Sequence, residues 1–241
     1  MPTDSPFPQL PVSGITIPTT ALTTAALSYS REHTSASTVN HCLRSAAFAL
    51  IFASKIPPYA AADAEAIVLS CILHDLGWAI GDSKALLSSD KRFEVDGADL
   101  AREFTRTHSD YDEVRLQEVW DAIALHTTPS IALHKQPVVA ATAMGILADF
   151  TGPHHPSGLL TVAEYKEVVG AFPRLDFREE LPRVMCGLCR DKPATTYDNF
   201  VGEFGAELLE GTEGESYRAD RDKHNVRKML LGGLEATKQY E

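Results

Sequence analysis

The stretch AEAIVLSCILHDLGW, residues 64–78, carries the strongest structural signal in this sequence. An almost continuous run of apolar and small residues follows Asp63, a residue suited to capping a helix, and the run closes at Gly77, a residue typical of helix ends. The stretch therefore predicts a buried helix over 63–77 with His74 and Asp75 at its C-terminal end. An imidazole and a carboxylate placed there need a partner, because burying an unpaired charge is costly.

Helical spacing of apolar residues recurs on both sides of this stretch. Ser, Thr, Asp or Pro stands at the start of most segments, and the first proline of Pro57-Pro58 disfavours helix at Ile56. No alternating run long enough for a strand occurs, and no repeat of 20–50 residues is present. The sequence therefore predicts an all-α fold. The expected helices span 20–31, 35–54, 63–77, 96–108, 112–126, 137–150, 161–171, 196–209 and 218–238, and either Ser35 or Ser37 could cap the second of them.

Changes in composition suggest three segments in the chain. Residues 1–18 are rich in Pro, Ser and Thr and predict an extended N-terminal arm over the surface. Residues 19–210 carry the helical pattern and predict a single domain, a helical bundle. Residues 211–241 predict a C-terminal extension that holds the last helix. The acidic tract ELLEGTEGES, residues 207–216, predicts a solvated break before that helix.

The charge balance narrows the classes of partner. Lys and Arg number 22 and Asp and Glu number 33, giving a net charge of −11. This excludes a general nucleic-acid binder and a protein that docks on anionic lipid through a basic surface. The N-terminus lacks the basic start and apolar segment of a secretory signal. We expect a cytoplasmic protein with a small-molecule substrate, no nucleic-acid partner and no membrane partner; self-association into a homo-oligomer stays open.

Two imidazoles and two carboxylates in apolar helical segments suggest a metal site. His41 lies in one such segment, and Asp149 lies in another among apolar neighbours. A divalent cation would offset the cost of burying these groups together with His74 and Asp75. Zinc suits such a donor set best, and iron or manganese also suit it. We therefore expect one divalent metal ion as the cofactor, held by His41, His74, Asp75 and Asp149.

The order of these residues, H…HD…D, resembles the HD-domain superfamily of metal-dependent hydrolases. Four flanking words support the resemblance and are similar to the cyanamide hydratase-like branch of that superfamily: NHCLRSAAFAL (40–50), CILHDLGW (71–78), RFEVDGADLAREF (92–104) and AIALHTTPSIA (122–132). The resemblance covers roughly residues 17–152. It implies an all-α HD-domain bundle and the four-residue ligand set given above.

Departures from the wider superfamily shape the expected site. Dinuclear members carry two further histidines, and here Phe93 stands at the first of those positions while His126 remains near the second. A mononuclear site is therefore expected, with His126 as a free imidazole. Many HD phosphohydrolases place Lys where this chain has Trp78. Trp78, Phe93 and Phe150 are expected to form an apolar substrate-binding wall. Arg44 is expected either to face substrate or to pair with a ligand carboxylate.

The resemblance implies a hydratase or hydrolase in which metal-activated water attacks a small neutral substrate, with cyanamide giving urea as the type reaction. The catalytic residues expected are His126, Thr127, Glu94 and Asp75. A phosphohydrolase of small nucleotides or phosphate esters is the alternative enzyme, but it needs cationic clamps that are scarce around HDLGW. An iron oxygenase would need two irons. A non-enzymatic module with a structural metal also stays open.

Overall fold

The computed structural model describes residues 5–240, and within this range the secondary structure is helical with no β-strand. An isolated antiparallel bridge joins Leu10 to Ile15. The predicted all-α class is therefore confirmed. None of the described helices is both long enough and apolar enough to cross a membrane.

The described chain divides into two compact units. The first comprises residues 5–87 and Phe93–Phe177, and the second comprises Ser88–Arg92 and residues 178–240. The predicted boundary at residue 210 falls within the second unit, so the division into a domain over 19–210 and an extension over 211–241 stays a prediction.

Most helices of the first unit begin where the sequence predicts helix caps. The helix predicted over 96–108 instead begins at Phe93, and the short helix Pro129–Ala132 was not predicted. The side chains of Thr20, Ser35, Asp63 and Thr161 each accept a hydrogen bond from the backbone three residues on. At Ile56 the backbone is extended before Pro57, which ends the second helix. The eight helices are α1 (Ala21–His33), α2 (Ala36–Lys55), α3 (Ala64–Leu73), α4 (Phe93–His108), α5 (Glu113–Ala124), α6 (Pro129–Ala132), α7 (Pro137–Thr151) and α8 (Val162–Ala171).

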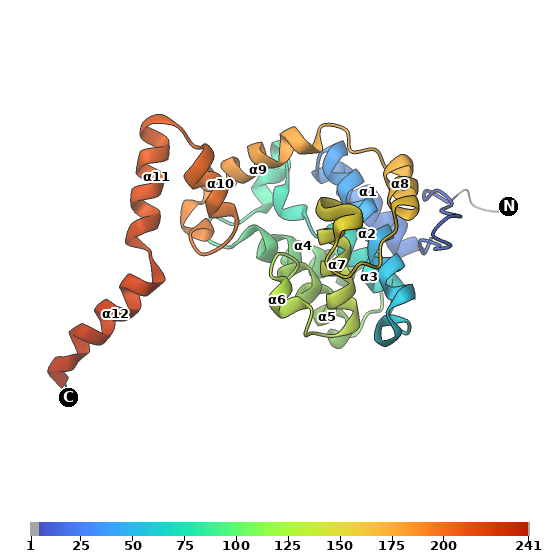
Figure 1. Cartoon of the computed structure of the whole chain (residues 1–241), viewed down its shortest axis with the longest axis horizontal. Helices are drawn as coiled ribbons and strands as arrows, with labels where there is room; N and C mark the ends of the chain where they lie inside the picture. Colours follow the sequence, from blue (N-terminus) through green and yellow to red (C-terminus); the bar gives the residue numbers. More distant parts are fainter. Residues whose placement is uncertain (1–4, 241) are drawn as a thin grey trace. The chain divides into compact units, whose positions relative to one another are not determined.

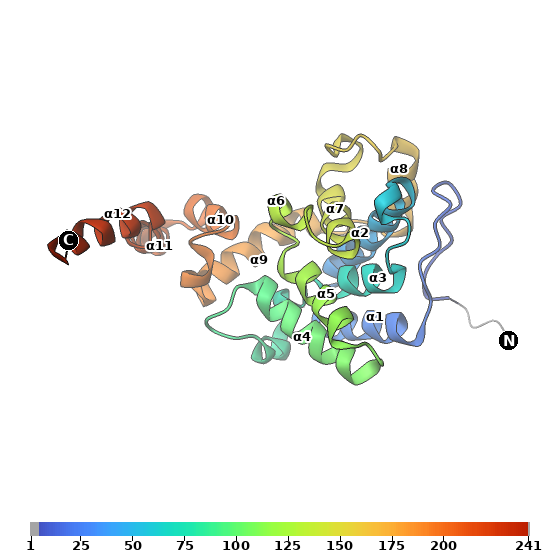
Figure 2. The same cartoon turned by 90° about the horizontal axis from the view of Figure 1, so that it is seen from below.

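The core of the first unit is built on α2, which packs extensively against α7 and α3 (Figures 1 and 2). Close approach of α2 and α7 depends on Gly145, because a Cβ at that position would lie 2.4 Å from the carbonyl oxygen of Ser45. His41 lies one helical turn from this contact on α2, and Asp149 lies one helical turn from it on α7. The close packing of α2 and α7 therefore brings together two of the predicted metal ligands.

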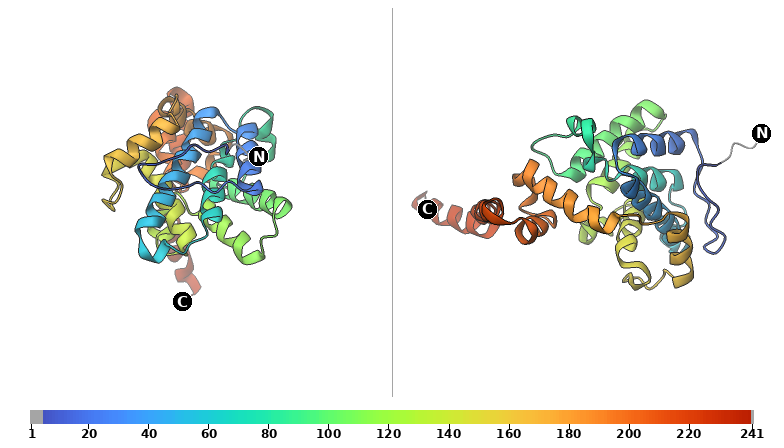
Figure 3. Two further views of the ribbon diagram at one scale, coloured as in Figure 1. Left: turned by 90° about the vertical axis from the view of Figure 1, so that its right-hand side faces the viewer. Right: turned by 90° about the horizontal axis from the view of Figure 1, so that it is seen from above.

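The N-terminal arm is attached to the first unit by apolar and polar contacts. Phe7, Leu10 and Ile17 are buried in its hydrophobic core. The backbone N–H groups of Val12 and Ser13 donate to the carboxylate of Glu167. Figure 3 shows this segment as the dark-blue loop near the N-terminus. Residues 1–4 of the predicted arm lie outside the described residues.

The second unit differs from the sequence prediction in three places. The helix predicted over 196–209 begins only at Val201, because a 3₁₀ turn over Pro193–Thr196 and a loop come before it. The helix at 177–191 was not predicted, because its charged start and the internal Pro182 obscure the apolar pattern. The predicted break over 207–216 is wrong: a helix begins at Gly211, and Asn225 caps a separate final helix by accepting from the backbone of Lys228. The helices are α9 (Phe177–Asp191, whose first residue belongs to the first unit), α10 (Val201–Leu208), α11 (Gly211–Lys223) and α12 (Val226–Thr237).

Candidate metal centre

The His74-Asp75 pair lies where α3 gives way to a 3₁₀ turn. His74 keeps helical backbone angles, whereas Asp75 has φ −99° and ψ 19° and leads into the turn Leu76–Trp78. This change of direction brings Oδ2 of Asp75 within 3.1 Å of Nε2 of His74. Gly77 is required in the turn, because a Cβ there would lie 2.1 Å from the carbonyl oxygen of Phe93. The start of α4 therefore packs directly on the His-Asp turn.

Hydrogen bonds fix which nitrogen of each histidine faces the centre. Nδ1 of His74 donates to the carbonyl oxygen of Cys71 at 2.8 Å, since a carbonyl can only accept. Nδ1 of His41 donates to Oδ2 of Asp149 at 2.7 Å. In the neutral imidazoles, Nε2 then carries the lone pair on both rings, and the two Nε2 atoms are only 3.3 Å apart. Two lone pairs this close repel unless a proton or a cation lies between them.

The carboxylate of Asp75 completes this group. Both of its oxygens are buried and accept no hydrogen bond among the described residues, and Oδ2 lies 3.6 Å from Nε2 of His41. One ligand atom from each of His41, His74 and Asp75 lies within 4.8 Å of the others. Burial lowers the pKa of His74, but the Asp75 charge and the contacts with Cys42 together outweigh burial and raise that pKa overall. Two imidazole nitrogens and an unsolvated carboxylate fit a divalent cation.

Asp149, the fourth predicted ligand, lies on the other side of the His41 ring. Its oxygens contact His41 Nδ1 and the guanidinium of Arg44, with Nε–Oδ1 at 2.7 Å and Nη2–Oδ2 at 2.8 Å. Burial tends to raise the pKa of Asp149, but the hydrogen bonds from His41 and Arg44 hold it well below its ordinary range. In this geometry Asp149 fixes the orientation of the His41 ring. Direct coordination by Asp149 stays a prediction.

Arg44 is a fully buried cation at the back of the centre. Besides Asp149 it donates to the carbonyl oxygens of Phe172 and Pro173, at 3.0 and 3.2 Å. Arg174 adds a second guanidinium 3.0 Å from Oδ1 of Asp149. Of the two roles expected for Arg44, the structure shows the pairing with a carboxylate. Arg174 was not singled out by the sequence, since no pattern links it to the His-Asp motif.

His126 lies beside the three-residue group but outside it. The centroid of its ring is 4.8 Å from that of His74, and its Nδ1 donates to the carbonyl oxygen of Ile123 at 2.6 Å. Nε2 is therefore the nitrogen with a lone pair. Burial lowers the pKa of His126 to about 4, so the ring is neutral at pH 7. The role of His126 as an imidazole that is not itself a ligand stays a prediction.

Glu94 and Thr127, the other two predicted catalytic residues, form a pair. The hydroxyl of Thr127 donates to Oε1 of Glu94 at 2.6 Å, and the Glu94 side chain is buried at the start of α4. Thr127 follows His126 directly, so the pair anchors the segment that carries the imidazole. Their catalytic roles stay predictions.

Aromatic rings surround the histidines. Trp78 lies parallel to the His41 ring with 6.4 Å between centroids, and Phe93 lies 5.7 Å from the ring of His126. Phe150 is 5.2 Å from His41 but remains half exposed. The sequence missed Phe177, which stacks on His41 at 4.5 Å. Phe177 carried no signal in the sequence, because it lies in the first turn of α9, a helix that was not predicted.

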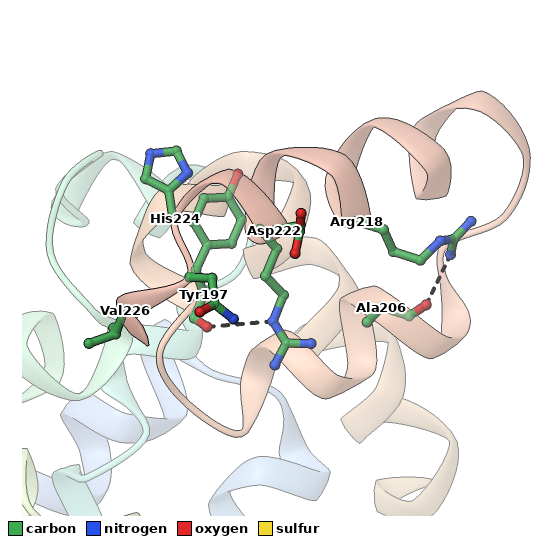
Figure 4. A pocket seen from close by; sticks show the side chains of 8 residues that line it. Tyr197, Ala206, Arg218, Asp222, His224 and Val226 are labelled. Carbon is green, nitrogen blue, oxygen red and sulfur yellow. Dashed lines mark hydrogen bonds between the residues drawn. The ribbon is translucent and has the colours of Figure 1, made fainter. Parts of the chain in front are cut away.

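The second unit holds a separate surface pocket of about 340 Å³ (Figure 4). Its two arginines are already engaged: Arg218 donates to the carbonyl oxygen of Ala206 and Arg221 to that of Tyr197, and Arg221 also pairs with Glu203. These contacts hold α11 to its own unit. The buried, convergent His-Asp group of the first unit is therefore the stronger candidate for chemistry.

Removing a bound metal should lower the thermal stability of the first unit. With the ion at about 100 times its Kd, binding contributes about 2.7 kcal/mol, which corresponds to a fall in Tm of roughly 5–10 °C after chelation. Calorimetry before and after chelation, with elemental analysis of both samples, measures this. Restoring zinc should restore the Tm. An identical Tm after verified metal removal would contradict a buried metal site.

Comparison with known families identifies the first unit. The HD-domain family matches residues 38–159, just over half of the chain, and the matched region includes His41, His74, Asp75 and Asp149. Comparison with individual curated proteins gives no match. Proteins of the HD-domain family are mostly metal-dependent hydrolases, and the three-residue group described above is suited to hold their metal. The chain belongs to the HD-domain family.

Proposed function

We propose that this HD domain is a mononuclear hydratase that adds water to a small uncharged substrate, with cyanamide as the lead candidate and urea as its product. The observation that carries the proposal is the pairing of both arginines at the centre with Asp149. Arg44 is fully buried and Arg174 is partly engaged by Asp149, which disfavours the bidentate arginine contacts that bind a phosphate best. A linear neutral molecule needs no such clamp.

The aromatic surroundings also favour a small neutral substrate. Trp78 and Phe93 are nearly fully buried, with ring centroids 5.8 Å apart, and Phe177 packs against Trp78. Apolar walls of this kind favour a compact uncharged molecule over a nucleotide, whose phosphates would lose their hydration. No single residue specifies a cyano group in the substrate. The proposal of a cyano substrate rests on the resemblance to the cyanamide hydratase-like branch.

The chemistry that a divalent cation supplies when bound is activation of water, whose pKa it lowers to about 7. The protein residues position the remaining groups. Asp149 and the Cys71 carbonyl hold His41 and His74 with Nε2 toward the centre. Neutral His126 presents Nε2, which can accept a proton from the attacking water and return it to the substrate nitrogen. Thr127, fixed by Glu94, keeps the His126 segment in place.

The test is an assay of protein loaded in turn with zinc, iron and manganese. The substrates are cyanamide, small nitriles and a panel of nucleoside monophosphates. We expect urea from cyanamide and negligible phosphate release. Brisk release of phosphate would replace the proposed substrate class with the phosphohydrolase alternative. Stoichiometric metal with a closed coordination shell and no turnover would favour the structural-metal alternative.

Replacing His126 with Ala should lower turnover by about 100- to 10,000-fold, the range typical of general acid–base groups. The metal content should stay at the wild-type level, because His126 lies outside the three-residue group. Turnover and elemental analysis are measured on the same preparation. The exposed His134 provides the control, since His134→Ala should change neither quantity. Loss of metal from His126→Ala would show that His126 is a ligand.

A further inference from the structure

Trp78 carries a buried hydrogen-bond donor without an acceptor. Its side chain is 6% exposed, and its Nε1–H finds no acceptor among the described residues. The other tryptophan, Trp120, behaves in the usual way: its Nε1 donates to Asp99 at 2.8 Å. A buried N–H without an acceptor costs free energy, and such groups are rare in native proteins. The unpaired donor of Trp78 therefore calls for a ligand.

The indole of Trp78 is held in place from several sides. Its backbone N–H donates to the carbonyl oxygen of Asp75 at 2.8 Å, which fixes Trp78 in the turn after the His-Asp pair. Its ring lies within 10° of parallel to His41 and contacts Phe93 and Phe177. The indole cannot rotate to find an acceptor elsewhere without displacing these rings. The indole ring therefore stays beside the His41 ring.

His126 complements this donor with an acceptor. Since Nδ1 of His126 is committed to the Ile123 carbonyl, its Nε2 offers a lone pair. The two residues are joined through Phe93, whose ring lies 5.8 Å from Trp78 and 5.7 Å from His126. Both side chains are buried, and each offers one polar atom. Together they suit a small molecule with an acceptor atom at one end and an N–H donor at the other.

We propose that the Trp78 indole N–H is a specificity-determining donor that holds the acceptor atom of the substrate, with His126 Nε2 receiving the substrate N–H. This inference rests on the proposed function, because it assumes a small substrate beside the bound cation. It narrows the substrate class to compact amino nitriles and amides. Nitriles without an N–H, and hydrocarbons of the same size, would use only one of the two contacts or neither.

The experiment follows the two indole N–H signals of zinc-loaded, ¹⁵N-labelled protein during titration with azide, a linear probe with terminal acceptor nitrogens. Trp120→Phe assigns the signals and leaves Trp78 as the single reporter. On saturation the Trp78 signal should move downfield while the Trp120 signal stays in place. Trp78→Phe should weaken azide binding, measured by calorimetry, by roughly 10-fold or more. Its zinc content should stay unchanged, and Trp120→Phe should leave the azide Kd unchanged.

Each outcome has a defined meaning. If azide binds without moving the Trp78 signal, the inference is overturned and the proposed function stands. If none of zinc, iron and manganese binds, or the metal binds but azide does not, the proposed function and this inference fall together. Because the spectral arm uses a chain with Trp78 intact, it decides the question even if Trp78→Phe does not fold.

Discussion

Asp75→Asn should reduce the bound metal from one ion per chain to almost none. Turnover should fall by roughly 1,000-fold or more, since metal catalysis supplies several kcal/mol and each 1.4 kcal/mol is tenfold in rate. The reason is that the Asp75 carboxylate supplies the only negative charge in the three-residue group and accepts no hydrogen bond among the described residues. Elemental analysis and a cyanamide assay measure the two effects.

The same variant should behave differently from an ordinary core substitution when both proteins are metal-free. The side chain keeps its shape, and the loss is limited to the pairing of Asp75 Oδ2 with Nε2 of His74 at 3.1 Å, so the Tm of the metal-free protein should fall by only about 5 °C or less. Asp110→Asn, at an exposed position, is the control and should retain both metal and turnover. Full metal retention by Asp75→Asn would remove Asp75 from the ligand set.

Arg44→Met should destabilise the first unit by about 3–5 kcal/mol, the cost of leaving one partner of a buried ion pair uncompensated. Arg44 is fully buried and contacts both oxygens of Asp149, so the variant leaves a buried carboxylate with a weaker set of partners. The expected fall in Tm is about 10 °C. Differential scanning calorimetry measures it, and metal affinity should also fall about 10- to 100-fold because His41 loses its fixed orientation.

Arg115→Met is the matched control for Arg44→Met. Arg115 pairs with Asp63 at the surface, with its side chain 40% exposed, so its removal should cost at most about 1 kcal/mol. The double variant Arg44→Met, Asp149→Leu should recover part of the loss, because both charges are then removed together. If Arg44→Met and Arg115→Met lower the free energy of unfolding equally, the buried ion pair of Arg44 is no more stabilising than a surface pair.

Local sequence patterns predicted much of the first unit. Apolar spacing and capping residues placed seven of its helices, because caps such as Ser35 and Asp63 act within one turn of chain. Helix boundaries were less certain: α3 ends at Leu73 instead of Gly77, since the His-Asp turn leaves the helical path early. In the second unit, α9 escaped prediction because its charged residues and Pro182 mask the pattern.

The candidate site shows the same division between local and long-range information. The adjacent His74 and Asp75, with His41 and Asp149 on other helices, were identifiable because a ligand set depends on residue type and order. The sequence position of a carboxylate, however, does not distinguish one that binds a metal from one that orients a histidine. Only the packing of α2 on α7 showed that Asp149 contacts His41 Nδ1 and Arg44.

The sequence by itself determined the all-α class, the His-Asp motif and the residues able to bind a metal, because these depend on short-range periodicity and on chemical type. The tertiary structure decided the orientation of the two imidazoles, the partner of Arg44 and the contact of Phe177 with His41. It also decided that the Trp78 donor is buried without an acceptor. These properties depend on distances between residues far apart in the chain, and helix packing alone sets those distances.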